Sequence, residues 1–355
     1  MGTEAIGRAA HAEGYLTAAG DEFAHAEGRS TTASGKNSHS EGYSTVASGE
    51  TSHAEGYKTS ASKAYSHAEG NQTTASGSGA HAEGGFTKAQ GQYSHAEGDQ
   101  SQANGVNAHA EGSGTLASGN NSHAEGDSTT ASGLGSHAQG YRTQATNDYA
   151  HAQGNTTVAS GKYSSAEGSN TSAVGQSSHA EGKQTTANGE ASHAEGSNNT
   201  VSGLGAHGEG YNNQVSGQGA HAEGNNNIAS AYGSHAEGDN NTIGVDAWNG
   251  HAEGGYVEVQ GVNGHAEGYA TKALGQYAHA QGDHAQATGA ISHAEGNTTI
   301  ASGKSSHAQG SNTTASGESA HAEGFSTISS GTGSHTEGGE TLASKTYAHA
   351  EGYKS

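Results

Sequence analysis

Histidine and glutamate two residues apart recur along the whole of this 355-residue chain. Both side chains can move protons, hold a metal ion or hydrogen-bond to each other. Serine precedes many of the histidines, so a serine–histidine–acid triad is easy to draw. A nucleophile, however, needs one oriented and activated position, whereas this arrangement occurs in 24 histidine-bearing copies. We therefore predict no catalytic residue and no enzymatic activity.

The histidine–glutamate pattern favours a hydrogen-bonded ladder between chains, with ordered metal binding as the alternative. A metal site normally uses one closed cluster of ligands rather than a ligand set in every repeat. No His-Glu-x-x-His motif is present. We predict no metal site, no cofactor, and an inter-chain ladder that includes the pairs His53 and Glu55, His67 and Glu69, His123 and Glu125, His193 and Glu195, and His265 and Glu267.

The spacing of these pairs comes from a repeat of 14 residues. With histidine as position 1, the series gives 17 repeats from His11 to His235, a step of 16 residues to His251, and 8 repeats from there to His349. Ser165 replaces the histidine once. A fixed period along a chain indicates a stacked array. We predict a lead-in over residues 1–10 and a single domain over residues 11–355, with a two-residue insertion near 239–250.

The working consensus is H-A-E-G-x-x-T-x-A-S-G-x-x-S. Glycine occupies position 4 in all 25 repeats and position 11 in 18 of 24 complete ones, which divides each repeat into two short extended segments. The exceptions at position 11 include Asp21 and Asn147, residue types that tolerate left-handed backbone angles. We therefore expect turn glycines at both positions, and left-handed backbone at position 11.

Composition limits the fold to a narrow one. Hydrophobic residues make up 29% of the chain, most of them alanine, and there is no proline to interrupt a backbone ladder. These features predict an all-β parallel β-solenoid with one repeat per coil, alanines of positions 2 and 9 inside, and threonines of position 7 outside. A net charge of −22 leaves no basic surface for nucleic acid. No apolar run approaches the ~20 residues of a membrane span, so membrane insertion is not expected.

Such a small interior predicts self-association. Position 1 to position 4 hardly changes between repeats, whereas positions 5, 6, 8, 12 and 13 vary freely. A packed surface is constrained and an exposed one is not, so we place His and Glu at a chain–chain contact. End-to-end assembly into longer filaments is a further option.

The pattern x-A-x-G-x-x-S/T-x-A-x-G resembles the head repeats of trimeric autotransporter adhesins, as in Ser122–Gly126 followed by Thr129–Gly133. It is also similar to repeats in fibre proteins of phage tails and bacterial surfaces. The resemblance covers practically the whole chain. It implies a left-handed β-roll, three chains side by side, and an adhesive or fibrous role on the exterior of a cell or virion. Two departures stand out: His and Glu flank the first alanine where that family has apolar residues, and the sequence shows no signal peptide, neck, stalk or anchor. We expect either a fragment or an assembly with another export route.

Three local features offer rival functions. Scattered tyrosines could contact surface glycans or a host receptor, as in a receptor-binding tail fibre. The irregular repeat holds the single tryptophan, and Trp248 with Tyr256 forms the candidate contact loop. A threonine ladder at position 7 could order water as ice-binding solenoids do. It is interrupted by four asparagines that we expect to stack amide on amide: Asn199, Asn213, Asn227 and Asn241.

Overall fold

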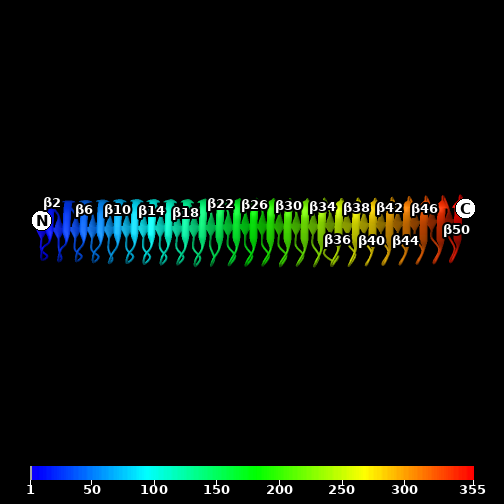
Figure 1. The fold of residues 1–355 in the computed structure, drawn as a ribbon, viewed down its shortest axis with the longest axis horizontal. Coiled ribbons are helices and arrows are strands. Elements are labelled where there is room, and N and C mark those ends of the chain that lie inside the picture. The colour runs from blue at the N-terminus through cyan, green and yellow to red at the C-terminus, as the bar shows by residue number, and fades with distance from the viewer. Residues whose placement is uncertain (1) are drawn as a thin grey trace. The chain divides into compact units, whose positions relative to one another are not determined.

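The computed structural model describes residues 2–355 and divides the chain into two units, Met1–Ser177 and Ser178–Ser355. Within each unit, coils of one repeat each follow one another in chain order (Figure 1). The long strands cover positions 1 to 5 of each repeat and carry even numbers. They run in steps of 14 residues from β2 (His11–Tyr15) to β24 (Ser165–Ser169), from β26 (His179–Lys183) to β34 (His235–Asp239), and from β36 (His251–Gly255) to β50 (His349–Tyr353).

The short strands cover positions 8 and 9 and carry odd numbers. After β1 (Glu4–Ala5), they run in the same steps from β3 (Ala18–Ala19) to β25 (Ser172–Ala173), from β27 (Thr186–Ala187) to β35 (Thr242–Ile243), and from β37 (Glu258–Val259) to β49 (Leu342–Ala343). β1 pairs with β3, so residues of the lead-in already form part of a coil.

Neighbouring coils pair in parallel with each residue above its own equivalent. β8 (His53–Tyr57) and β10 (His67–Asn71) show the register: His53 pairs with His67 and Glu55 with Glu69. No helix occurs in residues 2–355. The predicted all-β parallel β-solenoid of 14-residue coils is therefore confirmed. No helical segment of residues 2–355 has the length and apolar character needed to cross a membrane.

The turns are tied to the next coil as firmly as the strands. The backbone N–H of Thr51 donates to Lys36 O at 2.8 Å, and the N–H of Lys58 donates to Tyr43 O at 2.8 Å. Proline lacks this donor, so a coil with so many engaged N–H groups has little room for it. The absence of proline from the sequence follows from this pattern.

The interior is lined by four positions rather than two. Ala54 and Ala61, at positions 2 and 9, are fully buried as predicted, but Thr45 at position 7 and Ser52 at position 14 are buried as well. The prediction that the threonines face outward is wrong. Side chains alternate along an extended segment, so positions 7 and 9 share the inner face and position 8 lies between them on the outside.

The two glycine positions serve different purposes. Gly126 at position 4 has φ +117°, and a Cβ there would lie 2.1 Å from Gly140 O in the next coil. Gly35 at position 11 lacks a positive φ, but its Cβ would lie 2.0 Å from Gly49 O. The predicted left-handed backbone at position 11 is therefore wrong: close approach of the next coil selects that glycine.

Left-handed backbone occurs instead at positions 6 and 13, which are mostly not glycine. Lys58 at position 6 has φ 58° and Tyr65 at position 13 has φ 61°. Even the β-branched Ile291 adopts φ 57°. Such angles are uncommon for residues other than glycine and asparagine. Two tight turns per coil impose them here.

Candidate functional site: the histidine–glutamate face

The outer surface of the long strands carries position 1 and position 3 of every coil, and we call this surface the histidine–glutamate face. The alanine between them points inward, so period-2 alternation sends both polar side chains outward. His53 Nε2 lies 3.7 Å from Glu55 Oε2, and the side chains are 35% and 46% exposed. Comparable pairs span 3.6 to 4.0 Å. These are ion-pair distances, longer than a good hydrogen bond.

The imidazoles form a stacked column within each unit. His53 and His67 have ring centroids 4.7 Å apart and planes inclined by 7°. In the first unit the column runs to His151, and Ser165 takes the next place and donates to Glu167 Oε1 at 3.2 Å. In the second unit it resumes at His179 and includes edge-on contacts, as between His235 and His251.

Most of these histidines have a buried, unpaired ring nitrogen. Twenty Nε2 atoms are shielded from solvent and make no hydrogen bond, among them those of His25, His53, His193 and His265. A buried polar atom without a partner is costly, so it calls for an explanation. The face is chemically incomplete in the isolated chain.

Burial and like neighbours disfavour the charged imidazole. Burial, followed by the adjoining histidines, lowers the pKa of His67, whereas Glu69 opposes the shift more weakly. Desolvation is likewise the first cause that lowers the pKa of His95, His123, His137, His193, His221, His265, His293 and His321. Burial in the fold therefore favours the neutral form of these nine histidines.

Glutamine interrupts the glutamate column at four coils. Gln139 Nε2 donates to Glu125 Oε2 at 3.0 Å, and Gln153 Nε2 donates to Gln139 Oε1 at 3.2 Å. Stacked carboxylates repel one another. A glutamine in the column removes one negative charge, and its amide can donate a hydrogen bond to the side chain at position 3 of the preceding coil. The sequence analysis assigned no role to these four glutamines. Their placement at position 3, where other repeats have glutamate, could have indicated one.

All five predicted pairs lie on this face, at positions 1 and 3 of their coils. Three of them are close within one coil of one chain: His53–Glu55 and His67–Glu69 at 3.7 Å, and His193–Glu195 at 3.8 Å. Each of these histidines thus has a carboxylate of its own chain as neighbour. A contact with another chain stays a prediction.

The threonines of position 7 offer no flat outer surface. Thr17, Thr31 and Thr45 are fully buried, and so is Asn213 in the asparagine block. The ice-binding reading, which needed exposed hydroxyls, is therefore wrong. Its physical reason is the same inward alternation that filled the core.

The four asparagines stack along the coils, but they bind backbone rather than one another. Asn213 Nδ2 donates to Glu209 O at 2.6 Å and to Gly224 O at 2.9 Å. Its Oδ1 accepts from the backbone N–H of Asn227 at 2.8 Å. The predicted amide-to-amide stacking is therefore wrong in its partners. The buried carbonyls of the coil take the donors.

The irregular coil places its two extra residues, Val245 and Asp246, in a turn. The N–H of Gly250 donates to Ala247 O at 2.9 Å, which returns the chain to the regular turn geometry. Trp248 is 57% exposed and lines a hollow of about 330 Å³ with Tyr232 and Asn249. The sequence analysis missed Tyr232. When the two inserted residues are left out of the count, Tyr232 occupies the position equivalent to Trp248 in the preceding coil.

The predicted companion of Trp248 lies in a different turn. Tyr256 occupies position 6 of the next coil, and its ring packs edge-on against Tyr269 with centroids 5.7 Å apart. Trp248 and Tyr256 are both exposed. A role for either as a contact site stays a prediction.

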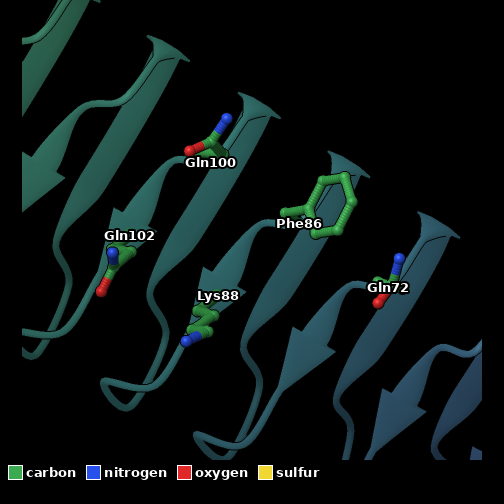
Figure 2. A pocket seen from close by; sticks show the side chains of 5 residues that line it. All are labelled: Gln72, Phe86, Lys88, Gln100 and Gln102. Atoms are coloured by element: carbon green, nitrogen blue, oxygen red, sulfur yellow. The ribbon is translucent and has the colours of Figure 1, made fainter.

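A second, wider hollow lies on the variable side of the first unit. Figure 2 shows Gln72, Phe86 and Gln100 in successive coils, with Lys88 and Gln102 on the neighbouring short strands. All five side chains come from positions 6 and 8. Its lining is a mixture of amide, amine and one aromatic ring, with no titratable pair that could carry out a reaction.

Fold and face together define a repeat-built structural protein: a parallel β-solenoid with one polar face repeated in each coil. The family model of the YadA head domain repeat, which spans two copies, matches residues 96–122, 110–136, 145–171 and 166–189. The predicted resemblance to trimeric autotransporter adhesin heads is thus confirmed in these segments. The YadA head family is adhesive and structural rather than enzymatic, and its head domains form trimers on cell surfaces. A search of curated proteins finds no match to the chain.

Proposed function

We propose that the chain is a non-enzymatic structural and adhesive fibre protein that forms a trimeric shaft on the exterior of a cell or virion. The observation that carries this proposal is the histidine–glutamate face, with its buried and unpaired Nε2 atoms. The match to YadA head repeats supports it independently. Phage tail fibre and bacterial surface fibre are both compatible with these features.

The physical case starts from the interior of a coil. The interior positions hold mainly alanine, serine and threonine, so each coil buries little apolar surface. Burying a second face would add to that small core. Glu55 and its equivalents remain about half exposed, so a neighbouring chain could pack on this face, and a turn of the His53 ring would bring its shielded Nε2 to a carboxylate of that chain.

The chain has no cysteine, which allows a direct test of the contact face. Glu69→Cys places one thiol on the histidine–glutamate face, and Gln72→Cys places one on an exposed turn of the same coil. After treatment with a short bismaleimide, we expect chain-to-chain cross-links in Glu69→Cys alone. Sedimentation of the unmodified chain should give three times the monomer mass.

Two results would refute the proposal. A monomer at every concentration at pH 8 and pH 5 would exclude self-association. An oligomer cross-linked through Gln72→Cys but not through Glu69→Cys would exclude this face as the contact.

Glycan contact is a second candidate function, favoured by the hollow at Trp248 and Tyr232. Two exposed aromatic rings beside an asparagine amide suit the apolar face and hydroxyls of a sugar ring. A glycan array with the whole chain is the test. Glycan binding that is lost in Trp248→Ala but retained in Tyr256→Ala would support this site. An array without any signal would reject it.

A further inference from the structure

We propose that two sets of residues on the second unit, His293–Glu295–His307 and His321–Glu323–His335, each bind one divalent transition-metal ion of the zinc class. This goes beyond the proposed function, because all three ligands of a set come from one chain. It also reverses the expectation from the sequence, in which an identical ladder in every coil argued against a closed ligand cluster.

The geometry singles out these two sets from the other coils. Within residues 2–355, only these two groups bring three candidate ligand atoms within 4.8 Å of one another. His293 Nε2 and Glu295 Oε2 are 3.9 Å apart, as are the corresponding atoms of His321 and Glu323. The repeat is the same everywhere, but side-chain placement is not.

The separation of histidine and glutamate within each set suits a single ion between the two ligands. Zinc bonds of about 2.0–2.2 Å place tetrahedral ligand atoms roughly 3.3 Å apart and opposed ones about 4.2 Å apart. The 3.9 Å gap of His293 and Glu295 is too long for a hydrogen bond but within this range. The ligand atoms of each set lie within 4.8 Å of one another, so the stacked rings of His293 and His307, 4.7 Å between centroids, must turn to bring both nitrogens within bonding distance of one ion.

The nitrogens that would bind the ion have no other partner. The Nε2 atoms of all four histidines in the two sets are buried and make no hydrogen bond. Glu295 can serve two imidazoles, because the second one, His307, has Gln309 rather than glutamate in its own coil. Of the residues described, none forms an ion pair with His307 or His335.

The ligand set also restricts the metal. Neutral imidazoles and one carboxylate suit Zn²⁺, Ni²⁺ and Cu²⁺ and are too nitrogen-rich for Mg²⁺ or Ca²⁺. A fourth position is left for water or for a ligand from outside the chain.

The test uses the full chain without an affinity tag, stripped with EDTA and then dialysed against Zn²⁺ or Co²⁺ at pH 7.5. Two tight ions per chain are expected, with the visible absorption of tetrahedral Co²⁺. The variant His307→Gln/His335→Gln should lose at least tenfold in affinity at both sites. The matched control is His123→Gln/His265→Gln, which removes two equally unpaired imidazoles outside the sets.

Equal loss of binding in the control would overturn the proposal, as would the absence of saturable binding. Uptake of one ion per coil would also overturn it, since that result would make the two sets equivalent to the rest. Glu295→Gln/Glu323→Gln keeps the imidazole stack and should also weaken binding, which separates ligand loss from misfolding. Sedimentation with EDTA reports self-association separately, so a chain that forms trimers in EDTA but shows no saturable binding of Zn²⁺ would refute this inference alone.

Discussion

The asparagine block offers a sharp test of how the coil interior is held together. Asn213 makes two donor contacts through Nδ2, to Glu209 O and Gly224 O, and accepts from the N–H of Asn227 through Oδ1. A threonine at the same place has one hydroxyl. Two coils earlier, Thr185 Oγ1 makes a single donation to Glu181 O at 3.1 Å.

Asn213→Thr therefore removes a net two hydrogen bonds, and each is worth about 1 kcal/mol in stability. The expected loss of local stability is about 2 kcal/mol. If exchange follows local opening, the backbone N–H of Asn227 should then exchange roughly thirtyfold faster. The reverse change, Thr185→Asn, should extend the block by one coil. The new side-chain oxygen would accept a hydrogen bond from the backbone N–H of Asn199, as Asn199 Oδ1 does for Asn213, and exchange of the Asn199 N–H should become slower.

Hydrogen exchange is the appropriate assay, because a stacked array need not unfold in one cooperative step. Gln214→Thr is the control, since that side chain is exposed and adjoins the same coil. Unchanged exchange at Asn227 in Asn213→Thr would refute the reasoning. So would faster exchange at Asn199 in Thr185→Asn, which would mean that the larger amide does not fit.

Three further predictions concern packing, backbone strain and pH. Gly208→Ala should lower the free energy of unfolding by about 1–3 kcal/mol through overpacking, because the new Cβ would lie 2.7 Å from Val201 Cγ2. Adding Val201→Ala should restore stability, which a double-mutant cycle of urea melts measures. Ile291→Asn should raise stability by about 1 kcal/mol, because asparagine tolerates the φ of 57° better, and an unchanged or lower urea midpoint would contradict this. The isolated chain should be most stable above pH ~6.5 and lose stability as the pH falls below it, because burial lowers the pKa of folded histidines such as His67 and the unfolded chain then binds more protons. A thermal midpoint that rises on acidification would contradict that sign.

The fold class was readable from the sequence because the period fixes the architecture directly. A step of 14 residues with invariant Gly126-type positions requires identical coils, and identical coils stack in register. The choice of inner and outer residues was harder. Thr45 was placed outside by its polarity, whereas strict alternation with Ala47 puts it inside.

Turn geometry could not be read from glycine alone. The sequence shows that position 11 prefers glycine. Glycine can be required either by a positive φ or by close approach of neighbouring backbone, and the sequence does not tell these causes apart. At Gly35 the cause is the carbonyl of the next coil, and no single repeat contains that information. At Tyr65 and Lys58 the backbone is left-handed without any glycine signal, because the stacked turn and not the residue imposes the angle.

The candidate site was found as a pattern but not as a geometry. His-x-Glu predicts a shared outer face, and His53 with Glu55 confirms it. The five residues from serine to glycine are the same around His293 and His53, but the coil that follows carries Gln309 in one case and Glu69 in the other. In the structure, His293, Glu295 and His307 have ligand atoms within 4.8 Å of one another, and among the residues described one further set, His321–Glu323–His335, has the same property.

The two proposals for this face compete for the same atom, and that competition makes them separable. An unpaired Nε2 can accept a hydrogen bond, donate one to a carboxylate of another chain, or bind a metal, but it can do only one of these at a time. If self-association satisfies His307, then Zn²⁺ should bind more weakly as the chain concentration rises. If the ion binds first, self-association should weaken when metal is added, since binding couplings are reciprocal. Sedimentation at two chain concentrations, with and without Zn²⁺, therefore determines whether copies of this chain and metal ions exclude each other or occupy different coils.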